Sequence, residues 1–530
     1  MAKASFCLRT AGSAALICLV GFLSACAGGG KPETAPGGVS IEAKRAEAAG
    51  LVARGHYEAF KKAATIYADL YALKAAHKSV AADYVKTLVL LRIRERQLSI
   101  QTSHTVDTAL AVIGANPELA GLKFYIEHAD LVASRTRGIQ VDFADTHSYA
   151  RWTQADFEKS MKAAQATQAD LRAKTTSADY YAFAYLAFYA SYAAGRDGQE
   201  DYGPIFALFP ESRLMLYMNA MRTTKEKPDL LERLTAADSE FYEAWFHLGE
   251  LALGERNLLS AEADFLKAEA GLVDSPQVFI YLASIYTTTE EFEKSLSYYD
   301  RTLALSPGYR DALLGKAISL SYLGRYREAI EVLGKMVELG NWLMGEAHYW
   351  LAWNRHALDE DAAAQAHIEE SKGRLPTNSE VFGLAGTIAL DLIQFDRAEK
   401  EFKEALKYNG GNVEALFGLG RISDSRSNWQ DASLYYDLAA EVVGRNEAAI
   451  ETKIAEIKAA PMAEDRRARM LKKKENQLLV TRVTRATAFY NAAASWLNLG
   501  RPDKARPAAE RAAAHPQFKE KATALLARMK

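Results

Sequence analysis

The three cysteines of this chain lie at positions 7, 18 and 26, and none follows in the rest of its 530 residues. A cysteine thiolate is a nucleophile that can accept a lipid or form a disulfide. The positions of the three cysteines therefore indicate thiol chemistry near the first residues of the chain. Cys26 follows an apolar run from Ala14 to Leu23, and two bases precede that run. A permanent membrane span needs about 20 apolar residues, so this shorter run is predicted to be a secretory signal.

The stretch Leu23-Ser24-Ala25-Cys26 resembles the lipobox of bacterial lipoproteins. This resemblance implies a signal peptide over residues 1–25 and a diacylglyceryl group plus an acyl chain, such as palmitate, on Cys26. Several acyl chains hold a protein stably on a membrane, whereas one chain binds marginally. Ala27 stands where lipoproteins kept at the inner membrane usually carry Asp, so the resemblance implies the outer membrane, with the protein facing the periplasm. The alternative is an ordinary cleaved signal with a chance cysteine.

Other residue groups give no persuasive catalytic or metal site. The sequence has no Gly-rich phosphate loop before a helix and no His-Glu-x-x-His motif. Asp142, Asp145 and His147 could meet a metal, but Asp and Thr in such a weakly patterned stretch more often cap helices or form turns. His348 and His356 would lie about 12 Å apart along a helix, too far to share an ion. We predict no catalytic residue, metal or cofactor.

Composition narrows the function further. The formal net charge is −2, so no overall positive field favours nucleic acid. Hydrophobic residues make up 49% of the chain, which is enough for a large packed core without disulfides. Residues 26–40 are rich in Gly and Pro and are predicted to be a flexible tether.

From Ile41 onward the pattern is helical, and a repeat of about 34 residues is visible between residues 236 and 440. A small residue recurs at Ala261, Ser295, Ala329, Ala364, Ala398 and Ala432. Four residues after each stands a bulky one: Phe265, Tyr299, Leu333, Ile368, Phe402 and Tyr436. Twelve residues before each stands another small one: Gly249, Ala283, Ala317, Ala352, Gly386 and Gly420. This spacing predicts one helix pair per repeat, with the small residues allowing close approach.

The register resembles the tetratricopeptide repeat, most clearly in the stretches that begin at Glu243 and at Leu323. The resemblance implies an all-α, right-handed solenoid of six repeats over 236–440, whose first helices line a concave groove that binds protein partners. By register, the groove residues are Phe246, Glu250, Ile280, Leu314, Tyr322, Tyr349, Trp353, His356, Leu390, Phe417 and Arg421. This set is aromatic and aliphatic with few bases, so an apolar or amphipathic segment fits it better than a peptide carboxylate. The alternative for any one residue is packing between repeats.

The regions on either side of these repeats are less regular. Residues 41–235 are predicted to be irregular helices with degenerate repeats. Residues 441–485 are predicted to form an elongated helical hairpin, and 486–530 a last repeat with a capping helix. The second arm of the hairpin carries six bases that could contact anionic lipid or an acidic partner, or simply face solvent: Arg466, Arg467, Arg469, Lys472, Lys473 and Lys474.

The functional prediction is a non-enzymatic, lipid-anchored periplasmic scaffold that binds protein partners, in the assembly of an envelope machine such as a pilus or secretion system. The assignment to an envelope machine rests on analogy with other proteins of the same fold. The alternative is a ligand-binding or transporter-associated helical lipoprotein, which a pocket among Tyr180, Phe183, Tyr189 and Tyr217 would support. The aromatic helix that carries three of these residues is otherwise read as core. An enzyme with a hidden site is the third reading.

Overall fold

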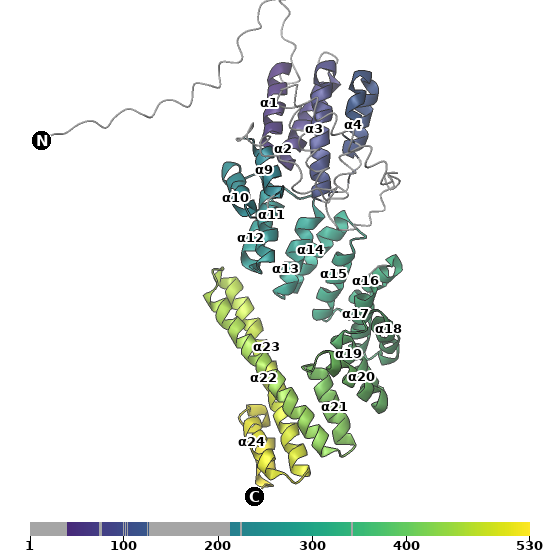
Figure 1. The fold of residues 1–530 in the computed structure, drawn as a ribbon, viewed down its shortest axis with the longest axis vertical. Helices are drawn as coiled ribbons and strands as arrows, with labels where there is room; N and C mark the ends of the chain where they lie inside the picture. The colour runs from purple at the N-terminus through teal and green to yellow at the C-terminus, as the bar shows by residue number, and fades with distance from the viewer. Residues whose placement is uncertain are drawn as a thin grey trace, which may run out of the picture.

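A computed structural model describes residues 40–126 and 212–529, apart from 74–76, 99, 101, 103, 124, 125, 223, 224, 341 and 342. The elements in these ranges are helices packed in consecutive pairs, which confirms the prediction of an all-α solenoid (Figure 1). The signal peptide over 1–25, Cys26, the acidic stretch from Asp142, and Tyr180, Phe183 and Tyr189 lie outside the described residues.

The helices before the repeats form the first part of the structure. They are α1 (Ile41–Arg54), α2 (Tyr57–Ala72), α3 (His77–Gln97), α4 (His104–Ala115), the 3-10 helix η1 (Pro117–Leu122), α9 (Arg213–Arg222) and α10 (Lys227–Ala237). Gly55 ends α1 in a left-handed conformation with φ of 77°, and a Cβ there would lie 2.9 Å from the backbone nitrogen of Leu214. Only glycine therefore lets α9 approach this turn so closely.

Six helix pairs follow within the part of the chain that the structure describes. The first three are α11 (Tyr242–Gly254) with α12 (Leu258–Glu269), α13 (Pro276–Thr288) with α14 (Phe292–Leu305), and α15 (Arg310–Tyr322) with α16 (Tyr326–Leu339). The next three are α17 (Met344–His356) with α18 (Asp361–Arg374), α19 (Ser379–Asp391) with α20 (Phe395–Tyr408), and α21 (Val413–Ser425) with α22 (Trp429–Ala459). Helix α22 is more than twice as long as the other second helices, because it is also the first arm of the hairpin.

The small and bulky positions of the repeat pack as the spacing predicts. All six small residues of the second helices, from Ala261 to Ala432, are fully buried. Phe402 of α20 shows why: a Cβ on Gly386 of the same pair would lie 2.5 Å from its ring, and one on Gly418 of the next pair 2.2 Å. The ring is therefore held between the first helices α19 and α21, and it couples this pair to the next.

The turn between the two helices of a pair also repeats. Arg256, Glu290, Asp359, Ile393 and Ser427 have φ between 55° and 61°, and Gly324 and Gly500 fill the same position in their pairs. A residue in the left-handed backbone conformation lets the chain reverse direction within a few positions. This conformation costs any residue other than glycine about 1 kcal/mol. The turn geometry is thus kept even where the residue is unfavourable.

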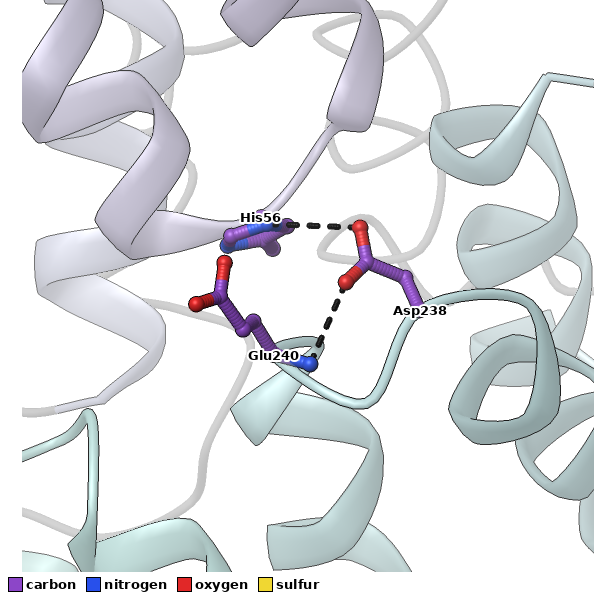
Figure 2. A group of neighbouring side chains, drawn as sticks. All are labelled: His56, Asp238 and Glu240. Carbon is purple, nitrogen blue, oxygen red and sulfur yellow. Dashed lines mark hydrogen bonds and ion pairs between the residues drawn. The ribbon is translucent and has the colours of Figure 1, made fainter.

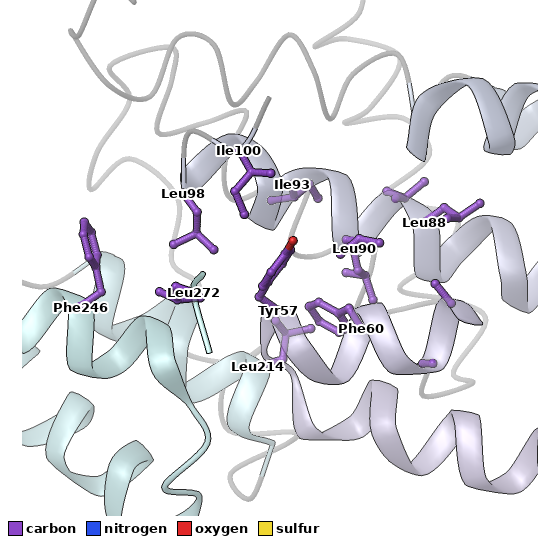
Figure 3. Close-up of a cluster of buried hydrophobic side chains, with 14 of the residues drawn as sticks. Tyr57, Phe60, Leu88, Leu90, Ile93, Leu98, Ile100, Leu214, Phe246 and Leu272 are labelled. Atoms are coloured by element: carbon purple, nitrogen blue, oxygen red, sulfur yellow. The ribbon is translucent and has the colours of Figure 1, made fainter. Parts of the chain in front are cut away.

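One hydrophobic core joins the N-terminal helices to the first repeats. It extends from Ala48 of α1 to Tyr286 of α13, and Figure 3 shows Tyr57, Phe60 and Leu88 in the same layer as Phe246 and Leu272. Arg94 of α3 is fully buried at this junction, where it donates to the Gly55 carbonyl at 2.8 Å and lies 3.4 Å from Glu243 of α11. The irregular half and the repeats are therefore one packed body.

The hairpin is formed by α22 and α23 (Glu464–Asn498), and α24 (Pro502–Ala513), η3 (Pro516–Phe518) and α25 (Lys519–Ala527) follow it. Ile454 and Ile457 of the first arm are buried, as is Leu478 of the second arm, whereas its neighbour Leu479 is exposed. Glu447 of α22 accepts hydrogen bonds from Arg482 and Arg485 of α23 and joins the arms near their middle. In Figure 1 the hairpin runs back from the last repeats toward α12 and α13.

Candidate partner-binding groove

The first helices of the pairs carry the predicted groove residues, and the structure divides these residues into three groups. Tyr322 (57% exposed) and Arg421 are exposed. Partly buried are Glu250, Ile280, Leu314, Tyr349, Trp353, His356 and Phe417. Phe246 and Leu390 are buried, and the Phe246 ring packs against Phe265 and Tyr281 at 5.6 and 5.7 Å. These two side chains belong to the core and are not available to a partner.

An aromatic stripe crosses three consecutive pairs: Phe292, Tyr322, Tyr326, Tyr349, Trp350 and Trp353. The Tyr322 ring stacks on Phe292 with centroids 4.9 Å apart and lies 5.7 Å from Trp350. Trp353 lies 5.6 Å from Trp350 and 5.8 Å from Tyr326. Such amphipathic rings are the residues that most often anchor protein interfaces. Sequence register missed Phe292, Tyr326 and Trp350, although the first two recur as bulky residues before the small position.

Carboxylates lie at the end of the stripe toward α19 and α21. His356 bonds Asp361 through Nδ1 at 2.6 Å, and its Nε2 lies 3.9 Å from Asp391. Thr387 of α19 donates to Glu414 of α21, and burial of the Glu414 carboxyl group raises its pKa. Glu414 also helps to raise the pKa of Tyr349, chiefly an effect of burial, so the acids lie beside the aromatic rings. This end of the stripe therefore combines aromatic rings with acidic side chains.

The basic arm of α23 contacts the chain itself. Arg466 pairs with Glu262 of α12 at 2.5 Å and with Glu291 at 3.2 Å. Lys473 and Lys474 pair with Glu290, at 3.3 and 3.1 Å. We call these three bases and three acids the clasp. The hairpin therefore does not project freely, because its tip is held on the turn between α13 and α14.

The clasp also reaches the aromatic stripe. The Lys473 ammonium lies 4.4 Å from the centroid of Phe292, the ring on which Tyr322 stacks. A cation over an aromatic face is attracted by the ring quadrupole. Of the other bases, Arg467 holds the hairpin turn through the carbonyls of Ala460 and Met462, and Lys472 is exposed. Anionic lipid would have to compete with Glu262, Glu290 and Glu291 for the clasp bases.

Two groups of histidine and carboxylate side chains occur among the described residues. Figure 2 shows the first, in which His56 Nε2 lies 3.6 Å from Asp238, with Glu240 beside them. Arg54 already donates to both carboxylates, at 2.8 Å to Asp238 and 2.6 Å to Glu240. Burial, together with the Arg54 charge, lowers the pKa of His56 to about 4. This group is an ion-pair network that joins α1 to the turn before α11.

The second group is His356, Asp361 and Asp391 in the groove. The His356 imidazole is hydrogen-bonded to Asp361 through Nδ1. The two aspartates of this group add negative charge to the acidic end of the stripe.

Tyr217, the described member of the proposed ligand pocket, is buried, and its hydroxyl bonds His247 at 2.8 Å. At that residue the structure shows packed core. Among the helices that the structure describes, none combines the length and apolar content needed to cross a membrane.

Comparisons with known proteins agree with this architecture. Two family models, both described as tetratricopeptide repeat, match residues 282–313 and 384–447. The human protein O-mannosyl-transferase TMTC1 is 25% identical over 209 residues, which cover 38% of this chain and 23% of that protein. An uncharacterized protein of Methanocaldococcus jannaschii, MJ0572, is 49% identical over 41 residues, which are 8% of this chain and 48% of that protein. The chain thus matches less than half the length of these curated relatives.

A solved structure of the C-terminal part of a tetratricopeptide-repeat protein from Cytophaga hutchinsonii is similar over 53% of this chain and 99% of that one. Its sequence identity is 15% and its TM-score 0.36. The matched family models and the helix pairs together show that this chain carries tetratricopeptide repeats, and such repeats generally bind protein partners.

Proposed function

We infer that this chain is a lipid-anchored periplasmic protein that captures a segment of a partner protein in its groove. The chain carries tetratricopeptide repeats, which act as scaffolds for protein–protein interaction. The observation that carries this proposal is the aromatic stripe beside the acids of α19 and α21. Buried aromatic anchors supply most of the free energy at protein interfaces. Carboxylates at one end would orient a segment that carries a base.

The partner segment would be amphipathic. Its apolar side chains would pack on Tyr322, Trp350 and Trp353, and a lysine or arginine would reach Glu414 or Asp391. Glu414 is exposed, and its carboxylate is oriented by the hydrogen bond from Thr387 of α19, so it is positioned to pair with that base. Since the pKa of Glu414 is raised, acid would protonate this group early and weaken the capture of a basic segment.

The groove is tested by site-specific photo-cross-linking in the cells that make the protein. A photoreactive residue in place of Tyr322 should cross-link to one partner, and the same residue in place of Tyr408 should not. Tyr408 is the matched control, because it is an exposed tyrosine on a second helix, at 38% exposure against 57% for Tyr322. Equal cross-linking from both positions, or cross-linking from position 408 alone, would contradict the proposal that the partner binds in the groove.

The affinity contribution of the stripe has its own measurement. With the cross-linked partner segment purified, Tyr322→Ala should weaken binding about tenfold or more, as expected when an aromatic anchor is truncated. Tyr408→Ala should leave binding unchanged. Because the Tyr322 side chain is largely exposed, helical circular dichroism should not change in either variant.

We propose a lipid anchor at Cys26, which would place the protein in the cell envelope, and a role there in assembling a pilus or secretion machine. Cys26→Ser should move the protein from the membrane fraction to the soluble fraction, while the groove variants remain in the membrane. A Cys26→Ser protein that still sediments with membranes would require another anchor.

A further inference from the structure

A cavity lies at the junction between the N-terminal helices and the repeats, and none of the aromatic stripe residues lines it. It has a volume of about 480 Å³ and is bounded by α2, α3, α4, the start of α13 and Leu305 at the end of α14. Its apolar wall includes Tyr57, Tyr84, Leu88, Leu91, Ile100 and Pro276. Pockets that bind small molecules are typically about 300–1,000 Å³, with an apolar lining and a few convergent polar groups.

Two buried phenols line this cavity without hydrogen-bond partners. Tyr57 is 3% exposed and Tyr84 is 7% exposed, yet in the part of the chain that the structure describes neither hydroxyl has a bonding partner. Figure 3 shows the Tyr57 hydroxyl directed toward Ile100, another residue that lines the cavity. Both residues are buried, but neither hydroxyl oxygen is among the fully buried polar atoms of the described residues that lack a partner, so both hydroxyls are open to the cavity and available to hydrogen-bond a ligand there.

The charges around the cavity select the sign of that ligand. Lys61, a base in the wall, pairs with Asp274 at 2.8 Å and is neutralised by it. Glu95 accepts from Thr105 at 2.6 Å and pairs with Arg92 at 3.3 Å. Asp69 has no ion-pair partner among the described residues, and its charge adds to the burial that raises the pKa of Tyr84. The uncompensated charge at the cavity is therefore negative.

We propose that this cavity binds a small amphipathic amine, with its apolar body against Tyr57, Leu88 and Leu91 and its ammonium group bonded to Asp69 and the Tyr84 hydroxyl. Burial keeps both phenols protonated, so each can accept from the ammonium and donate to another ligand atom. Tyrosine faces also attract organic cations. An anion would meet the unpaired carboxylate of Asp69 and be repelled.

Calorimetric titration of the full chain tests this assignment with three probes of similar size: 2-phenylethylamine, 2-phenylethanol and 3-phenylpropionate. The amine should bind saturably at one site, and the alcohol and the acid at least about tenfold more weakly, since each lacks the charge-assisted hydrogen bond. Failure of the amine to saturate, or equal binding of the acid, would overturn the proposal.

Variants locate the binding. Asp69→Asn should weaken amine binding about tenfold, and Tyr84→Phe, which removes one hydroxyl, about fivefold. Asp229→Asn is the matched control, an exposed aspartate of α10 away from the cavity, and should bind like the unmodified chain. If Asp69→Asn bound the amine normally, the site would lie elsewhere and the proposal would fail.

A second variant separates a lost site from a lost fold. Ala68→Phe places a ring in the cavity wall and should abolish amine binding while the helical circular dichroism is retained. Tyr322→Ala should leave the amine titration unchanged, because the groove and the cavity share no residue. The two functions can therefore fail independently.

Discussion

At the scale of single residues, the rings that lie between neighbouring first helices determine how closely the repeats pack. Tyr299 of α14 occupies such a place, and a Cβ on Gly315 of α15 would lie 2.2 Å from its ring. The ring cannot move far, because Tyr299 is buried and its hydroxyl bonds Thr287 at 3.2 Å. Glycine at 315 is thus required by the neighbouring side chain, not by its own backbone.

The glycine argument predicts opposite effects for the same substitution at two helical sites. Gly315→Ala should destabilise the protein by about 1–3 kcal/mol, the usual cost of overpacking. Gly334→Ala should stabilise it by about 0.5–1 kcal/mol, because a Cβ on Gly334 of α16 meets nothing within 4 Å. Urea unfolding of the two variants measures both values. A loss of stability in both would show that the difference in packing does not matter.

A histidine pair between α17 and α18 gives the fold a dependence on pH. His348 and His367 share a hydrogen bond of 3.1 Å between their Nδ1 atoms, so one ring must donate and the other accept. Burial lowers the pKa of both rings, that of His367 to about 4, and the neighbouring His348 contributes to this shift.

The sign of the pH effect follows from these lowered values. Unfolded histidine has a pKa of about 6.5, so below that pH the unfolded chain binds more protons than the folded one. The contribution is complete above pH 6.5 and is lost as the pH falls toward 4. After allowance for solvent screening we expect a loss of about 1 kcal/mol between pH 7 and pH 5.

The histidine prediction is measured as the urea midpoint at the two pH values. His367→Gln should reduce the loss on acidification, because it removes one of the two titrating rings. His56, whose pKa is also lowered to about 4, remains and should leave part of the dependence in place. An unchanged slope in His367→Gln would contradict the role of the pair.

At the scale of elements, the clasp is an electrostatic contact between the hairpin tip and the turn after α13. Lys473→Glu with Lys474→Glu should release the tip, because both new carboxylates would face Glu290. Lys472→Glu makes the same kind of change on an exposed neighbour and should not release it. Adding Glu290→Lys to the double variant should restore the contact through reversed pairs.

Spin labels on the two elements report the release of the clasp. With the three native cysteines replaced by serine, cysteines at Ala468 and Glu293 would carry the labels, since both positions are exposed. The distance distribution should be narrow in the unmodified clasp and broad in the double variant. Raising the salt to about 1 M, where the Debye length falls to about 3 Å, should broaden it in the unmodified clasp as well. If the distance distribution stayed narrow both in the double variant and at high salt, contacts other than the clasp would hold the hairpin tip.

Sequence patterns predicted the helix pairs well because each pair repeats the same local packing problem. The spacing from Ala261 to Ala432 identified residues that the structure buries completely. An elongated hairpin near the C-terminus was also predicted. Its docking was not, because the six bases of the second arm say nothing about Glu290, which lies more than 170 positions earlier in the chain. Phe246 was assigned to the groove for a similar reason, since register cannot show that Tyr281 and Phe265 cover it.

At the scale of the whole molecule, the N-terminal helices and the repeats share one core, and the amine cavity lies in that shared part. Ser275, at the start of α13, donates to the carbonyl of Leu98, and Glu243 accepts from the backbone of Tyr57. These buried bonds cross between parts of the chain that weak sequence periodicity had separated. Periodicity reports local packing, and contacts between residues this distant leave no period in the sequence.

The clasp has a further consequence for how the protein unfolds. In an open array of repeats, stability is nearly a sum of neighbour terms, and fraying starts at a free end. Here α22 continues from the sixth pair, and the tip of its hairpin returns to α12 and to the turn before α14. The repeats from α14 to α21 therefore lie within a closed circuit of contacts. Melting any one of them must also break the clasp or strain it, so this part of the solenoid should unfold as a single cooperative unit.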